Sequence, residues 1–263
     1  KLPQILKEIK AFQPAIVDYE GGQKNISYSQ ISMFTRCPHQ WELAYKEKLQ
    51  IYKESIHTSF GTSFHEVIQA YFETYYNDST KAADEMDLAL MLGTQMKSNY
   101  ALGKEKNGGE HFSTSTELLE FYEDGVAILK EFKKRKANFI SKKTFRILDF
   151  KTSTRGWNAE AKKDVMKQNQ IILYKEFFSR QFNVPKEKIE VAFLIVKRKI
   201  WDKSDFPQPR VSEFIPASGP IKSKKAVATV KEFITECFTK EGAYQDKTYK
   251  KIPSQSNCRW CPF

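Results

Sequence analysis

The 263-residue sequence is poor in cysteine and histidine, with four of each, and no apolar run approaches the roughly 20 residues that a membrane-spanning helix needs. Its start also lacks the charged segment and apolar centre of a signal peptide. Four cysteines are too few for the disulfide framework of a secreted protein of this length. We therefore expect a soluble, intracellular, cytoplasmic protein that makes no membrane contact.

The sequence also lacks a G-x-G-x-x-G pattern after any strand-like run, which disfavours a flavin- or nicotinamide-dependent redox protein. It is rich in cations instead, with 43 Lys and Arg against 32 Asp and Glu and a formal net charge of +11. Such a charge attracts polyanions and favours the release of their counterions. Nucleic acid is the expected partner, although many basic proteins bind none and the charge alone does not decide.

The N-terminal half has mainly helical patterns. Residues 27–45 predict two short helices, because Pro38 interrupts the pattern beside Cys37. Apolar residues recur at helical spacing over residues 64–75, which predicts a helix capped by Thr62 or Ser63. Two further helices, expected within residues 76–138, would form a helical insert.

The C-terminal half changes in character. Residues 145–150 and 189–196 are short β-branched and aromatic runs that predict buried strands. The helix expected between them, residues 162–182, would present Val165, Ile172 and Phe177 to a core. Residues 201–214 suggest an edge hairpin or an ordered loop. Strand, helix and strand in this order indicate an α/β fold, and we expect a single domain over residues 1–263.

A last helix is expected at residues 224–238, with Cys237 on its apolar face. There the thiol is more often a packing group than a reactive one.

The strand around residue 149 carries the most informative chemistry. Asp149 and Lys151 share one face of this strand because side chains alternate, while Leu148 and Phe150 point to the core. A carboxylate and neighbouring carbonyls, including that of Phe150, could hold Mg²⁺ or Mn²⁺, and the lysine could orient a water for phosphodiester hydrolysis. The pattern D-x-K is weak by itself, since a strand-end ion pair explains it equally well.

Three more polar residues, which lie on predicted helices, could belong to such a site. His65 lies beside the apolar stripe of its helix and could be a metal ligand through its neutral imidazole. Gln170 and Tyr174 are four residues apart and therefore share one helical face. Each also has an ordinary explanation, as a structural histidine or as polar positions on a helix surface.

The order of these elements resembles the RecB-like branch of the PD-(D/E)XK nuclease superfamily, which includes CRISPR-associated adaptation nucleases and phage exonucleases. The matching residues are Ser27 to Ser29, Cys37 with Pro38, Gly61 with His65, Asp149 with Lys151, and Gln170 with Tyr174. The resemblance implies a restriction-endonuclease-like fold, a central mixed sheet flanked by helices, with a helical insert.

The same resemblance implies roles for individual residues. His65 and Asp149 would bind the metal, Lys151 would be the catalytic lysine, and Gln170 with Tyr174 would position the DNA or that lysine. One departure concerns the family's first strand aspartate, which usually precedes the D-x-K strand, because Asp124 lies in a helical pattern. We therefore expect further encoded residues between about 139 and 144; the alternative is a catalytically inactive relative.

The C-terminus holds a C-x-x-C pair, Cys258 and Cys261, a spacing typical of metal or cluster ligation. It resembles the family's terminal cysteine motif, which implies that Cys37, Cys258 and Cys261 would be three ligands of a [4Fe-4S] cluster. The fourth cysteine would then lie after residue 263. Zn²⁺ is an alternative occupant, and free thiols in a tail are another.

The expected function is metal-dependent hydrolysis of DNA, by an exonuclease or a single-strand-preferring nuclease of replication, recombination or repair. The compact form resembles phage versions of the family, for which the location would be the host cytoplasm. Stacking on unpaired bases beside a cationic groove is how single strands are usually held, and the expected DNA contacts are Tyr174, Trp157, Lys197, Arg198 and Lys199. The alternative is a non-catalytic DNA-binding or scaffold protein on the same fold.

Overall fold

The computed structural model describes residues 7–8, 11–12, 26–50, 53–140, 144–201, 206, 208–259 and 261–263. The chain divides into two compact units. One, called here the sheet unit, comprises residues 52–163 and 191–216. The other, the helical unit, comprises residues 1–51, 164–190 and 217–263. The single domain expected over residues 1–263 stays a prediction.

A three-stranded sheet in the order β1-β2-β3 carries the sheet unit. The strands are β1 (Phe145–Ser153), β2 (Ile189–Lys197) and β3 (Val211–Phe214). Strands β2 and β3 are antiparallel, with Phe193 opposite Phe214 and Val196 opposite Val211. The sheet as a whole is mixed and is flanked by helices, so the expected α/β fold class is confirmed. The segment 201–214 contributes β3, and thus forms the edge strand that the sequence suggested.

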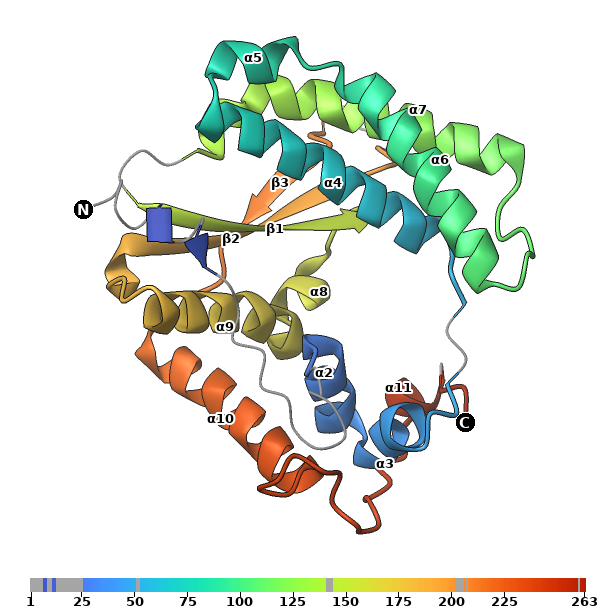
Figure 1. Cartoon of the computed structure of the whole chain (residues 1–263), viewed down its shortest axis with the longest axis vertical. Helices are drawn as coiled ribbons and strands as arrows, with labels where there is room; N and C mark the ends of the chain where they lie inside the picture. The colour runs from blue at the N-terminus through green and yellow to red at the C-terminus, as the bar shows by residue number, and fades with distance from the viewer. Residues whose placement is uncertain are drawn as a thin grey trace. The chain divides into compact units, whose positions relative to one another are not determined.

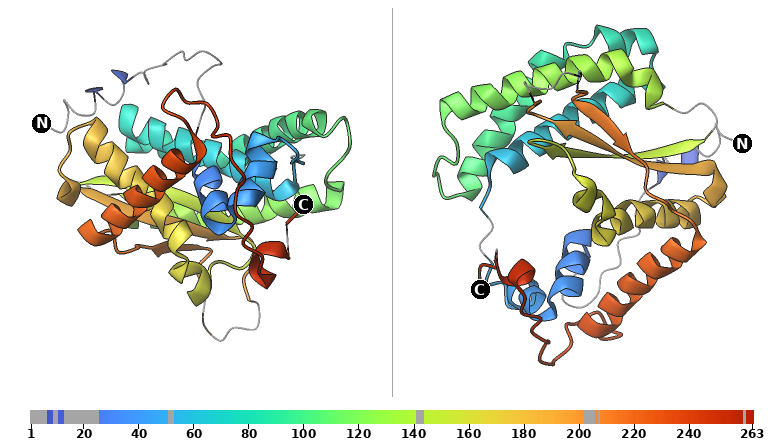
Figure 2. Two further views of the ribbon diagram at one scale, coloured as in Figure 1. Left: turned by 90° about the horizontal axis from the view of Figure 1, so that it is seen from below. Right: turned by 180° about the vertical axis from the view of Figure 1, so that it is seen from behind.

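Helices α4, α6 and α7 form a layer on this sheet (Figures 1 and 2). The helices of the unit are α4 (Ile56–Asn77), α5 (Thr80–Glu85), α6 (Leu88–Lys106), α7 (Ser115–Arg135) and α8 (Ala159–Lys163), with a 3₁₀ turn, η2 (Lys136–Asn138). The apolar faces of α4, α5, α6 and α7 and the inner face of the sheet share one core, which includes Phe64, Phe132 and Phe150. The predicted insert of residues 76–138 is therefore packed into the core of this unit.

Helix α4 begins earlier than expected. Its N-cap is Ser55, not Thr62 or Ser63, and the Ser55 hydroxyl accepts a hydrogen bond from the Thr58 amide at 3.3 Å. The Ser55 amide in turn donates to the Thr58 hydroxyl at 3.0 Å, which closes a capping box. Ile56 and Phe60 are buried and extend the apolar stripe by two turns. The longer helix results because this cap satisfies the first amides in place of the later serine and threonine.

The longer helices among the described residues of the helical unit are α2 (Tyr28–Arg36), α9 (Val165–Gln181) and α10 (Pro220–Cys237). Its shorter elements are α3 (Pro38–Trp41), the π-helix η1 (Glu42–Lys46), the 3₁₀ turn η3 (Lys186–Lys188) and α11 (Gln255–Cys258). Helix α2 ends just before Cys37 and Pro38 starts the next helix, so the predicted interruption is confirmed.

The buried face of α9 differs from the one that we expected. Ile172 is fully buried, but Val165 is 64% exposed and Phe177 is 46% exposed. Ile171 and Leu173 are buried in their place. The apolar residues of this helix surround much of its circumference, so periodicity alone did not distinguish the face that packs.

No helix in the described ranges is both long enough and apolar enough to span a membrane.

Trp41 is the centre of the core of the helical unit and is fully buried. Its ring lies 5.3 to 6.3 Å from those of five other aromatic residues, measured between centroids. These residues are Phe34, Phe233, Phe238, Tyr244 and Tyr249. Cys237 is buried in the same cluster, which confirms its packing role.

Substitution Trp41→Ala is expected to lower the free energy of unfolding by about 3 to 5 kcal/mol, since it removes a large side chain from a packed aromatic cluster. The measurement is denaturant unfolding followed by circular dichroism. Trp201→Ala serves as the matched control: Trp201 is 59% exposed, so its loss should change stability by about 0.5 kcal/mol or less. Equal effects of the two substitutions would contradict a core centred on Trp41.

Candidate active site

Strand β1 presents Asp149 and Lys151 on one face, as its alternation predicts. Phe150 is 6% exposed and packs in the core of the sheet unit, which anchors the strand. Asp149 is 8% exposed, and its Oδ2 lies 3.1 Å from Nζ of Lys151. This Oδ2 is buried, and apart from the ion pair with Lys151 it has no hydrogen-bond partner among the described residues. A buried carboxylate oxygen in this state is a group that a cation would stabilise.

Helix α4 approaches β1 closely at Gly61. A Cβ atom at this position would lie 3.3 Å from Oγ1 of Thr152, tighter than an ordinary van der Waals contact. One helical turn later, His65 lies against Phe150. Four residues of helix rise about 6 Å, and two residues of strand span nearly the same length. The G-x-x-x-H spacing therefore matches the spacing of alternate residues on the strand that carries Asp149.

The contact between His65 and β1 joins two of the expected metal ligands. Nε2 of His65 lies 2.7 Å from the backbone oxygen of Phe150, although the residues are 85 positions apart. The carbonyl can only accept, so the imidazole Nε2–H donates. In the other tautomer the proton is on Nδ1, and the lone pair of Nε2 would be available to a metal ion beside the Phe150 carbonyl oxygen.

The residues present fit a hard divalent metal ion. The donors are one carboxylate, one backbone carbonyl and one imidazole, a set compatible with Mg²⁺ or Mn²⁺ completed by water. Within the described residues no group of three or more His, Cys, Asp and Glu side chains could hold a metal ion. The expected ligand set of His65, Asp149 and the Phe150 carbonyl contains two such side chains and one main-chain oxygen, and of its members His65 and the Phe150 oxygen are in contact.

Gln170 and Tyr174 pair with each other on α9, in the helical unit. Nε2 of Gln170 donates to the Tyr174 hydroxyl at 2.9 Å, and Tyr174 is 42% exposed. Near them, the Tyr28 hydroxyl donates to the backbone oxygen of Met166. Burial raises the pKa of Tyr28, and the negative charge of Asp164 adds to the effect. The expected pair is thus formed and accessible.

Arg198, one of the expected DNA contacts in the sheet unit, is engaged in contacts within the protein. It is 6% exposed, lies 3.1 Å from Oδ2 of Asp124, and its guanidinium carbon is 3.4 Å from the centroid of the Phe121 ring. Lys199 lies 2.8 Å from Glu120, and this hydrogen bond raises the pKa of Lys199, with the charge of Asp124 contributing. These contacts favour a structural role for Arg198.

Trp157 and Lys197 remain closer to the surface. The Trp157 ring is half-buried and packs 5.1 Å from Phe193 and 6.3 Å from Phe214. Gly156, at φ +86°, leaves space for the aliphatic part of Lys197, which a Cβ atom would meet at 2.8 Å. The glycine therefore determines the course of the lysine side chain beside the tryptophan.

The aspartate that the resemblance requires before β1 has no counterpart in the described part of the sheet unit. Asp124 is 8% exposed and is paired with Arg198, and it lies 3.8 Å from Arg210. Its charge is thus already balanced. The place where we expect further encoded residues, between about 139 and 144, falls largely on residues 141–143, which lie outside the described residues.

The cysteines expected to bind a cluster lie in the helical unit. Nδ2 of Asn257 donates to the backbone oxygen of Arg36 at 3.0 Å, which brings together the chain neighbours of Cys258 and Cys37. The Cys261 amide donates to the oxygen of Cys258 at 3.2 Å, so the C-x-x-C segment forms a turn. Cys37 and Cys261 are half-buried and Cys258 is exposed.

Thr152 is a site residue that the sequence did not reveal. It matters only because its side chain faces Gly61 across a helix–strand contact, and no local pattern predicts that contact.

A comparison with protein-family models matches residues 25–123 to the PD-(D/E)XK nuclease superfamily. Members of this superfamily are typically metal-dependent nucleases that act on DNA, so the match suggests this class of enzyme. Comparisons with curated proteins and with solved structures gave no match. The matched range includes Gly61 and His65 and ends before Asp149 and Lys151. The three-stranded mixed sheet flanked by helices is consistent with the fold of the superfamily.

Substitution Gly61→Val is expected to weaken Mn²⁺ binding by about 10- to 100-fold, as loss of a supporting contact does at metal sites. The added side chain would collide with Thr152 and move His65 away from the Phe150 carbonyl. Isothermal titration calorimetry measures the affinity. Thr62→Val, which places the same side chain on the exposed next position of α4, is the control. Unchanged affinity in a folded Gly61→Val protein would contradict the role assigned to this contact.

Proposed function

We propose that this chain is a metal-dependent deoxyribonuclease that hydrolyses phosphodiester bonds, as an exonuclease or a single-strand-preferring nuclease in replication, recombination or repair. One observation carries the proposal. Nε2 of His65 lies 2.7 Å from the carbonyl oxygen of Phe150, the strand residue between Asp149 and Lys151, whose side chains pair at 3.1 Å. The family match over residues 25–123 supports the same class of activity.

The chemistry follows from these groups. A bound Mg²⁺ or Mn²⁺ would polarise the scissile phosphate and lower the pKa of a coordinated water. Asp149, the Phe150 carbonyl and His65 would hold the ion from one strand and one helix. The Lys151 ammonium, 3.1 Å from Asp149, can orient the attacking water and stabilise charge that develops on the phosphate.

Other residues would hold the substrate. We assign Gln170 and Tyr174 to positioning of the DNA or the lysine, since their pair is accessible on α9. Trp157, Lys197 and Lys199 are proposed as contacts of the strand, through stacking and phosphate charge. Arg198, which we expected beside them, would support this segment through Asp124 and contact DNA only if that ion pair opened.

We further propose that Cys37, Cys258 and Cys261 are three ligands of a [4Fe-4S] cluster, or of Zn²⁺. Among the described residues the three thiols do not form a metal-binding group. The proposal is supported by the Asn257–Arg36 hydrogen bond, which joins the segments that carry the cysteines. A metal at this place would link the segment before α3 to the C-terminal segment and would stabilise the helical unit.

The nuclease proposal predicts cleavage of end-labelled single- or double-stranded DNA in Mg²⁺ or Mn²⁺ and none in EDTA. Asp149→Ala and Lys151→Ala should each lower the rate by at least about 10³-fold, because each removes a group that acts on the transition state. Gel electrophoresis of the products over time measures the rate and, from the product ladder, whether cleavage starts at an end.

Asp78→Ala is the matched control, since Asp78 is an exposed carboxylate of the same unit at the end of α4. DNA binding without cleavage by the wild-type protein in any metal would replace the nuclease proposal by the non-catalytic DNA-binding or scaffold alternative.

The cluster proposal predicts a pattern of cysteine alkylation. Burial raises the pKa of Cys237 to about 12, so this thiol should resist iodoacetamide in the native protein with or without metal. Cys37, Cys258 and Cys261 should react after removal of the metal and be protected in the metal-loaded protein. Mass spectrometry of tryptic peptides, with iron, sulfide and zinc assays, measures this. Equal labelling of the three cysteines in both states would refute the proposal.

A further inference from the structure

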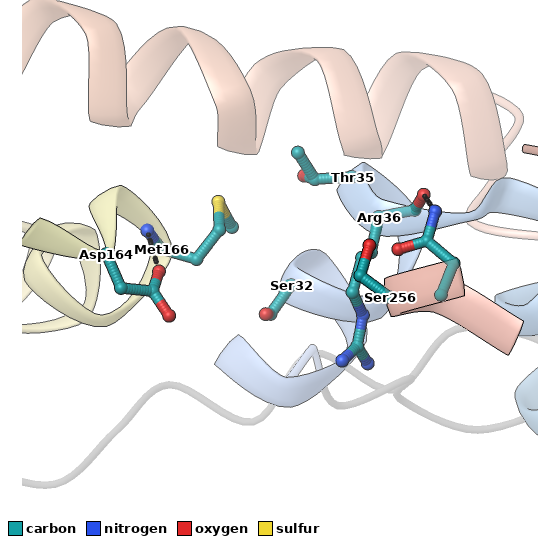
Figure 3. A pocket seen from close by; sticks show the side chains of 7 residues that line it. Ser32, Thr35, Arg36, Asp164, Met166 and Ser256 are labelled. Atoms are coloured by element: carbon teal, nitrogen blue, oxygen red, sulfur yellow. Dashed lines mark hydrogen bonds between the residues drawn. The ribbon is translucent and has the colours of Figure 1, made fainter. Parts of the chain in front are cut away.

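A pocket of about 480 Å³ lies in the helical unit, between α2, the start of α9 and α11. Figure 3 shows Asp164 and Met166 on one side of it, and Ser32, Arg36 and Ser256 on the other. Its volume is within the range of small-ligand sites and would accommodate about one nucleotide. None of its lining residues belongs to the proposed metal site or to the cysteine motif.

Hydrogen-bond donors dominate the lining. Ser32 and Arg36 are four residues apart on α2 and so share one helical face, with Thr35 beside them. Among the described residues, neither the Ser32 hydroxyl nor the Arg36 guanidinium makes a hydrogen bond or an ion pair. Both groups are therefore available to a ligand.

The remaining polar groups are partly committed. The Thr35 hydroxyl donates to the oxygen of Ile31 at 2.9 Å, and the Ser256 hydroxyl lies 3.0 Å from that of Ser254. The Asn257 amide nitrogen donates to the oxygens of Arg36 and Ile252. These bonds hold the walls of the pocket in place.

Asp164 is the one carboxylate in the lining, and its charge is engaged within α9. Its Oδ1 accepts the amides of Met166 and Lys167 as the helix cap, at 2.9 and 3.2 Å. Its Oδ2 lies 3.6 Å from Nζ of Lys167. The uncommitted charge facing the pocket is therefore the positive charge of Arg36.

We propose that this pocket binds a phosphate group of a nucleic-acid strand, with Arg36 and Ser32 as its main contacts. Arginine and serine are typical partners of strand phosphates, and a guanidinium can bind two phosphate oxygens at once. Met166 would supply an apolar wall for the adjoining sugar or base. This inference rests on the proposed nucleic-acid substrate and adds a second contact region, in the helical unit.

The test is binding of labelled single-stranded oligonucleotides in EDTA, by fluorescence anisotropy, over a range of salt concentrations. Arg36→Ala is expected to weaken binding at least fivefold and to reduce the slope of log K against log salt by about 0.7, the contribution of one phosphate contact on a single strand. Ser32→Ala is expected to weaken binding about threefold with an unchanged slope, because it removes no charge.

Lys225→Ala is the matched control, since it removes one cation from an exposed position of α10 in the same unit. Oligonucleotides with a 5′-phosphate, a 3′-phosphate or hydroxyls at both ends distinguish a terminal phosphate from an internal phosphodiester. Inorganic phosphate as a competitor tests recognition of the isolated group. Thermal melting verifies that each variant is folded. If Arg36→Ala does not fold, the affinity of Ser32→Ala tests the pocket instead, because alanine suits a helix.

An affinity and a salt slope for Arg36→Ala equal to those of Lys225→Ala would overturn the inference, as would wild-type protein that binds none of the oligonucleotides. Because binding is measured in EDTA, it does not depend on cleavage. Arg36-dependent binding without nuclease activity would leave the pocket in place and remove the proposed function; metal-dependent cleavage with Arg36-independent binding would do the reverse.

Discussion

The close approach of helix α4 to strand β1 brings His65 to the main chain of the strand that carries Asp149 and Lys151. Gly61 allows the approach because a larger residue would press on Thr152. His65, one turn later, then reaches the carbonyl of Phe150. Both elements are held by a shared core in which Phe64 and Phe150 are buried. Side chains carried on a helix and a strand are placed more precisely than side chains on loops.

A pair of buried charges lies beside the C-terminal end of β1, where the Arg198 amide donates to the Ser153 oxygen at 3.0 Å. Asp124 on α7 accepts Arg198, which follows β2, and neither side chain is exposed by more than a tenth. Removing one member of such a pair leaves an uncompensated buried charge, so the pair is a constraint on the fold. The basic segment after β2 therefore contains both a buried, paired charge, that of Arg198, and a charge near the surface, that of Lys199.

The helical unit is held together by an aromatic core and by hydrogen bonds of its C-terminal segment. Aromatic rings around Trp41 pack α2, α3 and α10 together, and the chain after α10 is tied back through hydrogen bonds such as that of Asn257 to Arg36. The same bond positions the end of α2 beside α11, where the Arg36 pocket is lined from both elements. One contact thus contributes to the cysteine segment and to the pocket that is proposed to bind phosphate.

Local periodicity in the sequence was sufficient for much of the fold. The alternation of β1 placed Asp149 with Lys151 and buried Phe150, and the apolar stripe over residues 64–75 predicted the central part of α4. Residues 211–214, which pair with β2, lie inside the segment 201–214, for which the sequence suggested an edge hairpin or an ordered loop. These features depend on neighbours a few residues away, which a sequence displays directly.

Tertiary structure decided the features that depend on residues distant in the chain. The Ser55 cap extended α4, Val165 turned out exposed, and Arg198 is buried against Asp124, 74 positions away. The pocket that includes Arg36 likewise joins three segments that are remote in sequence. Periodicity describes which faces of an element are apolar; which partner covers a face, and which charge neutralises another, is set by packing of the whole unit.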